Sequence, residues 1–262
     1  MRAPSVLLSI ESLSKSFAGL TVIDGVTMSV DRGERVALIG PNGAGKTTLF
    51  NLITGAYPVS AGRILLDGRE ITDMADWRRA RLGVARSFQN IRLMPHLSAI
   101  ENVMLGQHPR AHGVLQQLAP IGWPRNNRWR REAAEALERA GLGDVADEAV
   151  YNLPYGIQKR IELVRATLAH PRVLLLDEPA AGLNRRETED LAALLRTLSQ
   201  TGLTLLVVEH DMHFVGRLCQ RLIVLNFGRK IAEGSPSQVQ RDPAVVEAYL
   251  GSNRSLEAAH AS

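Results

Sequence analysis

The sequence predicts an α/β fold in which a mainly parallel sheet is joined by an antiparallel β layer and an inserted helical region. Three patterns support this prediction. A continuous apolar run, "RVALIG", leads through a glycine-rich loop into a helical segment, as a buried parallel strand does. Alternating apolar and polar segments flank this unit. Helical patterns dominate from about residue 91 to 169, and apolar strand patterns then return.

The composition is that of a globular protein. The chain has 262 residues, of which 45% are hydrophobic and 22% charged, enough for one large domain or a core with an attached subdomain. The formal net charge of +4 is too small to indicate nucleic-acid binding. The single cysteine, Cys219, excludes an intrachain disulfide and is expected to be a packed residue. We expect a soluble chain, because no signal peptide is recognisable and the apolar runs are far shorter than the ~20 residues of a membrane span.

The N-terminal part is expected to form the antiparallel layer. Segment 22–30 places apolar residues mostly two positions apart, and Asp67 and Gly68 form a turn signal between two short strands. Between these elements, the helical segment 46–54 follows the glycine-rich loop and is expected to stop at Gly55. This part therefore combines a parallel unit with an antiparallel sheet.

The middle and C-terminal parts return to helices and then to strands. Ser98 and Glu101 have the spacing of a capping box, and a charged helix is expected to end at Gly141. Three later apolar runs, "VLLLDE", "LTLLVVEH" and "RLIVLN", are separated by helical segments, which predicts helical crossovers and parallel strands.

The loop "GPNGAGKT" fits the phosphate-loop pattern, with a strand before it and a helix after it. Gly43 and Gly45 allow backbone N–H groups to turn toward phosphate oxygens, and the following helix N-terminus adds partial positive charge. Lys46 supplies a charge for the β- and γ-phosphates, and the Thr47 hydroxyl can bind Mg²⁺. The predicted nucleotide-binding positions of this loop are Gly40, Pro41, Asn42, Gly43, Ala44, Gly45, Lys46, Thr47 and Thr48. A glycine-rich turn without a ligand is the alternative.

Two carboxylates follow the apolar run "VLLLDEP". We expect their strand to lie beside the phosphate-loop strand, because nucleotide sites form at the carboxyl ends of such sheets. Asp177 is predicted to hold Mg²⁺, directly or through water, and Glu178 to polarise the water that attacks the γ-phosphate. A solvated strand end would be the simpler interpretation if the phosphate loop were absent.

With these motifs, the chain resembles the ATP-binding-cassette (ABC) ATPases over nearly its whole length. The resemblance implies one ATPase domain over 1–250, with the helical subdomain at about 91–169 inserted, and a flexible tail over 251–262. In that family a second subunit completes the nucleotide site by pointing a signature loop at the γ-phosphate. Here "LPYGI" occupies the place of the usual Leu-Ser-Gly-Gly-Gln.

The signature residues Pro154, Tyr155 and Gly156 are therefore expected to bind the ATP of a partner subunit in trans. Pro154 has no N–H to donate, and Ile157 replaces the usual glutamine. Similar Pro-Tyr-Gly signatures look like those of cassette ATPases that serve branched-chain amino acid uptake. The helix that begins near Gly156 still offers N–H groups and a dipole.

The resemblance assigns roles to five further positions. Gln89 is implied as a catalytic residue that senses Mg²⁺ and water, and His210 as the catalytic histidine that contacts the γ-phosphate. Phe17 is implied to stack on adenine, and Val22 to belong to the nucleotide site. Asn184 lies in the loop that crosses the dimer interface, where many relatives carry aspartate. The alternatives are a surface polar role for Gln89, a strand-end capping role for His210 and a core role for Phe17.

The region 106–131 has no assigned role. Residues 108–124 lack periodicity and are a candidate surface loop. Trp123 and Trp129 stand among arginines, which could suggest nucleic acid, but a solvated helix face or contact with anionic lipid is the favoured interpretation. No nucleic-acid partner is expected.

The resemblance is to the larger ATPase subunit of a branched-chain amino acid importer. It implies ATP and Mg²⁺ as cofactors, a second ABC ATPase subunit, two transmembrane permease subunits, a periplasmic substrate-binding protein, and a peripheral place on the cytoplasmic face of the inner membrane. The working dimer could be homomeric or heteromeric. Related ATPases of urea or amide uptake, or of lipopolysaccharide export, remain alternatives. A soluble ABC ATPase of translation or DNA repair is a different class, which usually has two cassettes or a long coiled coil.

Overall fold

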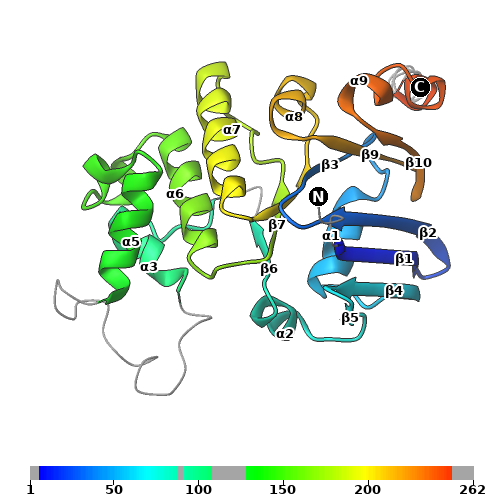
Figure 1. Ribbon diagram of the computed structural model, residues 1–262, viewed down its shortest axis with the longest axis horizontal. Coiled ribbons are helices and arrows are strands. Elements are labelled where there is room, and N and C mark those ends of the chain that lie inside the picture. The colour runs from blue at the N-terminus through cyan, green and yellow to red at the C-terminus, as the bar shows by residue number, and fades with distance from the viewer. Residues whose placement is uncertain (1–5, 88–90, 108–127, 250–262) are drawn as a thin grey trace, which may run out of the picture.

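A computed structural model describes residues 6–87, 91–107 and 128–249 (Figure 1). A four-stranded sheet lies at one end of the molecule, and three helices lie at the other end. These helices are α3 (Ala99–Leu105), α5 (Arg128–Arg139) and α6 (Tyr155–Thr167). A six-stranded sheet occupies the space between the two ends.

The four-stranded sheet is the predicted antiparallel layer, with strand order β2-β1-β4-β5. Its strands are β1 (Val6–Phe17), β2 (Leu20–Asp31), β4 (Ala61–Leu66) and β5 (Arg69–Glu70). The turn residues Asp67 and Gly68 have φ values of 55° and 74°. Two successive positive φ values suit the right-handed twist of a tight hairpin, so the Asp-Gly signal is confirmed.

The six-stranded sheet has the order β10-β9-β3-β8-β7-β6. Its strands are β3 (Arg35–Ile39), β6 (Val84–Ser87), β7 (Val173–Asp177), β8 (Thr204–Val208), β9 (Arg221–Asn226) and β10 (Arg229–Gly234). All neighbours are parallel except β9 and β10, which are antiparallel. The predicted parallel sheet is thus confirmed, with one antiparallel edge strand.

The expected adjacency of the two motif strands is wrong. Strand β8 lies between β3 and β7 and pairs with both, Leu205 with Arg35 on one side and Thr204 with Val173 on the other. All three strands are apolar and buried on both faces, so no local pattern distinguishes their order. The two motifs still meet at one edge of the sheet, because parallel strands end on the same side.

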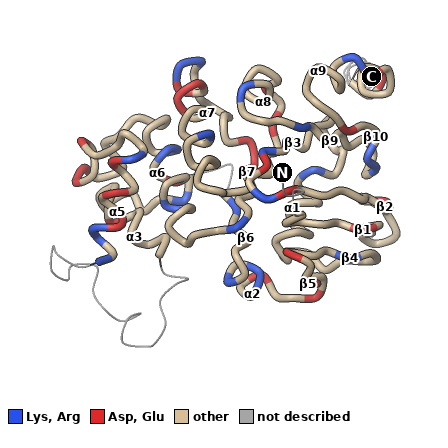
Figure 2. Tube along the Cα trace, viewed as in Figure 1, with Lys and Arg blue, Asp and Glu red and all other residues tan. Residues whose placement is uncertain are grey.

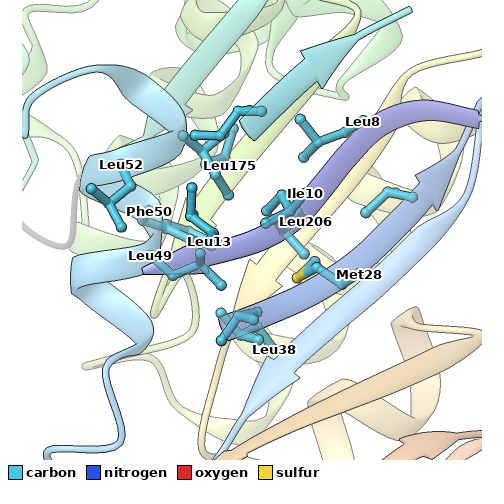
Figure 3. Packing of buried hydrophobic residues seen from close by; sticks show 14 of the residues in the cluster. Leu8, Ile10, Leu13, Met28, Leu38, Leu49, Phe50, Leu52, Leu175 and Leu206 are labelled. Carbon is cyan, nitrogen blue, oxygen red and sulfur yellow. The ribbon is translucent and has the colours of Figure 1, made fainter. Parts of the chain in front are cut away.

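The central strands of the six-stranded sheet, β9, β3, β8 and β7, are buried on both faces, as their continuous apolar runs predict. In β3, Val36 and Leu38 pack into the core shared with the antiparallel sheet, whereas Ala37 and Ile39 face the opposite core. The first core lies between the two sheets and α1 (Lys46–Thr54), which contributes Leu49, Phe50 and Leu52 (Figure 3). Helix α1 ends at Gly55 as predicted, with φ of 83°.

The opposite face of the sheet is covered by helices. Side chains from α6, α7 (Arg185–Gln200) and α8 (Met212–Leu218) fill the second core. Among them, Phe214 of α8 is completely buried. Burial of such a side chain stabilises the fold by roughly 1.5–3 kcal/mol. The other elements are α2 (Asp76–Arg81), α9 (Pro236–Val239) and the 3₁₀ turns η2 (Gly143–Val145) and η3 (Val150–Asn152), and residues 243–249 are also helical.

A third core joins α3, α5 and α6. The predicted capping box begins α3: Ser98 Oγ accepts a hydrogen bond from the Glu101 N–H at 3.3 Å, and Glu101 Oε2 accepts one from the Ser98 N–H at 2.8 Å. Helix α5 ends at Arg139, two residues before Gly141, whose φ is 64°. The helical pattern of this region is therefore confirmed where the structure describes it.

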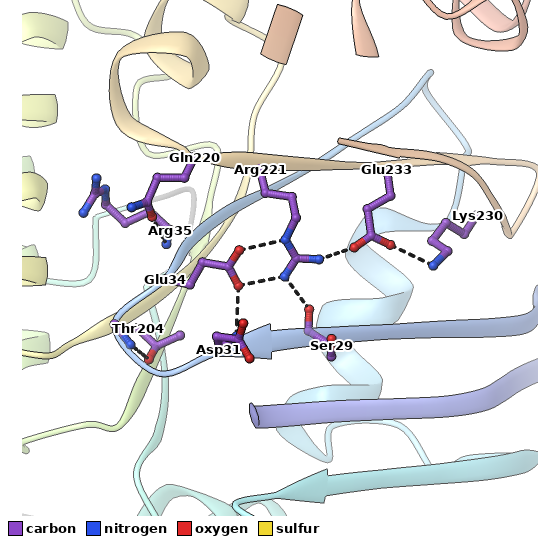
Figure 4. A network of polar contacts seen from close by, with 10 residues as sticks. Ser29, Asp31, Glu34, Arg35, Thr204, Gln220, Arg221, Lys230 and Glu233 are labelled. Carbon is purple, nitrogen blue, oxygen red and sulfur yellow. Dashed lines mark hydrogen bonds and ion pairs between the residues drawn. The ribbon is translucent and has the colours of Figure 1, made fainter. Parts of the chain in front are cut away.

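An ion-pair network fastens the two sheets together (Figure 4). Arg221 of β9 donates to both carboxylate oxygens of Glu34 at 2.7 Å, to the Ser29 carbonyl oxygen of β2 at 2.8 Å, and to Glu233 of β10. The two hydrogen bonds that Arg221 donates to the Glu34 carboxylate raise the pKa of the guanidinium above its ordinary value. This arginine consequently joins three strands at one point.

Charged residues of both signs are interspersed along the described elements (Figure 2). In the described ranges, none of the helices has the length and apolar character required to cross a lipid bilayer.

Candidate functional site

The phosphate-loop sequence forms the turn between β3 and α1. A Cβ atom on Gly40 would stand 2.0 Å from the Leu225 carbonyl oxygen, so only glycine fits there. Gly45 caps α1 with φ of 99°, a left-handed conformation that glycine adopts without strain. The loop therefore lies directly over the ends of β3 and β9, with the N-terminus of α1 opening from it.

Lys46 is the first residue of α1, and its side chain folds back over this loop. Its Nζ donates to the carbonyl oxygens of Gly40 at 2.6 Å and Pro41 at 2.9 Å. Burial lowers the pKa of Lys46, and the negative charges of Glu178 and Asp177 partly offset this effect. The ammonium group is thus held at the mouth of the loop, where it can be redirected to an incoming anion.

The other loop positions differ in exposure. Pro41 and Ala44 are buried, Thr48 is half-buried, and Asn42, Gly43 and Thr47 are exposed. The Ala44 carbonyl oxygen accepts from the Gly228 N–H at 3.0 Å, which ties the loop to the turn between β9 and β10. The side chains of Asn42 and Thr47 and the backbone of Gly43 therefore face solvent.

Val22 of β2 lies beside the start of α1. Its carbonyl oxygen is 3.1 Å from the position that a Cβ on Gly45 would occupy. The structure therefore places this predicted residue next to the phosphate loop, through its backbone.

Glu178 and His210 were predicted separately, and the structure brings them together. Asp177 ends β7 and is 8% exposed, and the Glu178 N–H donates to the Val208 carbonyl oxygen of β8 at 2.9 Å. Glu178 has φ of 46°, a strained conformation for a residue with a side chain. His210 Nε2 lies 3.0 Å from Glu178 Oε1. The pair spans the ends of two neighbouring strands.

Glu209, which sequence reasoning missed, organises the backbone around this pair. It is 4% exposed, and its carboxylate accepts hydrogen bonds from the N–H groups of Ala180 at 2.8 Å and His210 at 2.8 Å. The loop after Glu178 and the loop that carries His210 are therefore joined by one buried side chain. An acidic residue inside the apolar run "LLVVEH" was the available signal.

Arg86 is a second residue that sequence reasoning missed. It lies on β6, and its Nη2 atom forms an ion pair with Asp177 Oδ2 at 2.5 Å. Both side chains are only 12% exposed. The partners are 91 residues apart in sequence, so no local pattern could have joined them.

Phe17 ends β1 beside the turn into β2. Its ring is 39% exposed and meets the Tyr57 ring edge-on, with centroids 5.3 Å apart. The Lys15 ammonium lies 4.7 Å from the centroid of the Phe17 ring. The ring is thus fixed by two neighbours but remains accessible, as a stacking residue has to be.

The signature segment begins α6. Pro154 is the N-cap residue, and its carbonyl oxygen accepts the N–H groups of Ile157 and Gln158 at 3.0 Å each. The helix itself starts at Tyr155, one residue before the expected start. The Tyr155 ring packs on Gly182: a Cβ there would be 3.3 Å from Cε1 of the ring.

Gly156 is buried against Glu187 of α7. A Cβ atom on Gly156 would stand 2.6 Å from Glu187 Oε1, so this glycine makes room for a side chain of its own subunit. Glu187 also forms a capping box with Asn184, whose Oδ1 accepts the Glu187 N–H at 3.0 Å. Asn184 therefore caps α7 in the single chain, and the start of α6 rests on the same turn.

Some predicted positions fall outside the described residues. These are Gln89, Trp123, the whole loop 108–124 and the tail 251–262. Trp129 is described in α5, where its carbonyl oxygen accepts from Gln107 Nε2 at 3.0 Å. Cys219 directly follows α8 and is buried, and burial raises the pKa of its thiol to about 12, so the packed role is confirmed.

The donor set beside Lys46 suits a small hard cation. The Thr47 hydroxyl and the Asp177 carboxylate are oxygen donors, and Mg²⁺ bound to nucleotide phosphates commonly takes one or two protein ligands of this kind. Together, the loop, the lysine, the oxygen donors and the Glu178–His210 pair can bind a nucleoside triphosphate and activate water against it.

Comparison with known families agrees with this geometry. Residues 23–181 match the family model described as ABC transporter, and residues 229–254 match the model described as branched-chain amino acid ATP-binding cassette transporter. The chain is 42% identical over 251 residues to the high-affinity branched-chain amino acid transport ATP-binding protein BraF of Pseudomonas aeruginosa, covering 94% of this chain and 98% of the relative. It is 40% identical over 253 residues to LivG of Escherichia coli K12, with the same coverage.

Solved structures give the same answer for the fold. The ADP conformation of an ATP-binding cassette from an ABC transporter superposes with a TM-score of 0.84 at 30% identity, covering 94% of this chain and 99% of that one. A dimeric post-hydrolysis cassette bound to ADP and phosphate gives a TM-score of 0.73 at 26% identity, covering 88% and 99%.

Proposed function

The chain belongs to the ATP-binding proteins of the ABC transporter family, and from this premise we propose that it hydrolyses ATP to power the uptake of branched-chain amino acids. The observation that carries the hydrolytic part is the 3.0 Å contact between Glu178 and His210 at the sheet edge that also bears the phosphate loop. The names of the relatives, and the second family match near the C-terminus, support the choice of substrate.

ATP is held by the loop from Gly40 to Thr48. Backbone N–H groups and the N-terminus of α1 face the phosphates, and Lys46 exchanges the carbonyl oxygens of Gly40 and Pro41 for phosphate oxygens. The accessible ring of Phe17 stacks on the adenine, and Val22 borders the nucleotide from β2.

Thr47, Asp177 and Gln89 would hold Mg²⁺ beside the β- and γ-phosphates. The ion supplies positive charge that neutralises the phosphates during transfer. Asp177 is fixed at the end of β7, where its carboxylate pairs with Arg86.

Glu178 polarises the attacking water. Its backbone is fixed by the bond to Val208, and its carboxylate is oriented by His210. A water between Glu178 and the γ-phosphate would give up its proton toward this carboxylate as it attacks. His210 then contacts the γ-phosphate from the end of the neighbouring strand. Glu209 holds the loop after Glu178 and the loop that carries His210 together by accepting a hydrogen bond from each.

A second ATPase subunit completes the site. Pro154, Tyr155 and Gly156 at the start of α6 face the γ-phosphate bound by the partner, so ATP favours a closed dimer and hydrolysis releases it. The packing of Tyr155 on Gly182 keeps this helix start in contact with the loop that follows Glu178.

The assembly is proposed to include two permease subunits and a periplasmic binding protein. The chain would lie on the cytoplasmic face of the inner membrane as a peripheral subunit. We further propose that one ATPase domain covers 1–250, with a helical subdomain at about 91–169 inserted, and that 251–262 form a tail.

Affinity purification from the native host tests this proposal. The tagged chain is solubilised gently with its membranes, and the co-purifying proteins are identified by mass spectrometry. Polytopic permeases with a similar ATPase support the importer. A lipopolysaccharide-type permease pair without a sister ATPase would contradict the uptake function, and ribosomal or DNA-bound partners without a membrane protein would contradict the transporter.

A further inference from the structure

Arg86 forms an ion pair with Asp177, the carboxylate that the proposed function assigns to Mg²⁺. Its Nη2 atom lies 2.5 Å from Asp177 Oδ2, and both side chains are 12% exposed. Strand β6 pairs with β7 so that Arg86 stands opposite Leu175, and its side chain therefore extends toward the carboxyl end of β7 to reach Asp177.

The guanidinium group has further fixed neighbours on α1, the helix that begins at Lys46. Its Nη1 atom donates to Asn51 Oδ1 at 2.6 Å, and its Cζ atom lies 5.7 Å from the centroid of the Phe50 ring. A planar guanidinium with two directed bonds and an aromatic neighbour is held more firmly than a lysine would be. Arg86 thus links the phosphate-loop helix to the end of β7.

We propose that Arg86 is the counter-ion of Asp177 and that its charge weakens the binding of Mg²⁺ at this site. The inference rests on the proposed role of Asp177 as a metal ligand. Both cations need the same partly buried carboxylate oxygens, and a guanidinium a few ångströms away repels a dication at low effective dielectric. Mg²⁺ must therefore either displace Arg86 from Oδ2 or bind with this charge beside it.

This competition gives Arg86 a defined role. Without it, Asp177 would be a partly buried carboxylate close to Glu178, with Lys46 drawn back to the carbonyl oxygens of the loop. A partly buried carboxylate that has lost its direct ion-pair partner is costly and attracts cations strongly, even though the charge of Lys46 acts on it. Arg86 neutralises it until nucleotide brings Mg²⁺, so it is a residue that sets metal affinity and does not itself react.

The experiment measures how much Mg²⁺ tightens ADP binding. Dissociation constants of ADP are measured by equilibrium dialysis in EDTA and in saturating Mg²⁺, and their ratio is the metal factor. ADP is used because it is not hydrolysed. Arg86→Met keeps much of the side-chain length and removes the charge, and Arg63→Met removes an exposed arginine that pairs with Glu11 instead.

The proposal predicts that Arg86→Met raises the metal factor at least tenfold over the unmodified protein and makes ADP binding in Mg²⁺ tighter. Arg63→Met should leave the factor unchanged. Arg86→Lys keeps a positive charge but loses the planar guanidinium, and it should raise the metal factor at least threefold. This variant tests the proposal if Arg86→Met does not fold. An unchanged or smaller factor in folded Arg86 variants would overturn the proposal.

Asp177→Asn separates this inference from the proposed function. If it lowers the metal factor while the Arg86 variants leave the factor unchanged, the metal site stands and the counter-ion role fails. If Asp177→Asn has no effect on the factor, the assigned metal site fails, and the inference fails with it.

Discussion

His210 Nε2 lies 3.0 Å from Glu178 Oε1, across the ends of two strands that pair side by side. The glutamate is held in a left-handed conformation, and its N–H is bonded to Val208. A carboxylate fixed in this way by backbone and histidine is suited to orient a water molecule.

Glu178→Gln should lower ATP turnover at least a hundredfold while leaving ATP binding intact, because the amide cannot take a proton from the attacking water. The variant is therefore expected to accumulate as an ATP-stabilised dimer. Light scattering after size exclusion, with a parallel phosphate-release assay, measures both effects. Glu189→Gln is the matched control: this α7 side chain is 37% exposed and pairs with Arg185 and Arg217, away from the phosphate loop, so ATP turnover should equal that of the unmodified protein. An active monomeric Glu178→Gln protein would refute the two-site model.

Pro154→Ser should change ATP turnover by less than about tenfold. A serine at this N-cap can accept a backbone N–H and stabilise α6 by about 1 kcal/mol, but the helix end already exists without it. Steady-state phosphate release measures the effect, with Pro236→Ser at the start of α9 as a control far along the chain. A gain much larger than tenfold would show that the native signature loop is impaired.

Gly156→Ala should lower the free energy of unfolding by about 1–3 kcal/mol, because the new Cβ would meet Glu187 Oε1 at 2.6 Å. Urea denaturation measures this change. Adding Glu187→Ala should recover part of the loss, although that substitution alone removes a capping box.

Gly216→Ala in α8 is the control for Gly156→Ala, because a Cβ there has no atom within 4 Å. It should be neutral or stabilise the protein by about 0.5–1 kcal/mol. Equal losses in the two alanine variants would contradict the packing argument.

Arg221→Ala should lower the free energy of unfolding by about 2–4 kcal/mol, because it leaves the Glu34 carboxylate partly buried without its bidentate partner. Arg229→Ala removes an arginine whose side chain is 71% exposed, against 21% for Arg221, and should cost less than about 1 kcal/mol. Urea denaturation of both variants measures the difference. Similar losses would mean that the network does not join the sheets.

The Cys219 thiol should resist alkylation in the native protein at pH 8. Burial raises its pKa to about 12, so the reactive thiolate is scarce below that pH and increases only as the pH rises toward it. Mass spectrometry after maleimide treatment should show one adduct in urea and almost none without it. Rapid labelling of the native protein would contradict the buried position.

Local patterns were enough to predict much of the fold. The continuous apolar run of β3, the Asp67–Gly68 turn and the Ser98 capping box each depend on neighbours within a few residues. The family, its fold and its ATPase activity were likewise predictable, because the phosphate loop and the Asp177–Glu178 pair are contiguous motifs.

The remaining features depend on contacts that are distant in sequence. The place of β8 between β3 and β7 follows from strand pairing, and all three strands have similar apolar sequences. The contact of Arg86 with Asp177 likewise joins separate strands. Sequence reasoning explained Gly156 by the approach of a partner, whereas the described contact is with Glu187.

Uptake of labelled leucine by the native host tests the central claim most directly. The gene is deleted and replaced by either the unmodified sequence or Glu178→Gln, with equal amounts of both proteins in the membrane fraction. The unmodified protein should restore ATP-dependent leucine uptake, and Glu178→Gln should not. Leucine uptake that is unaffected by the deletion, or fully restored by Glu178→Gln, would contradict an ATPase that powers branched-chain amino acid import.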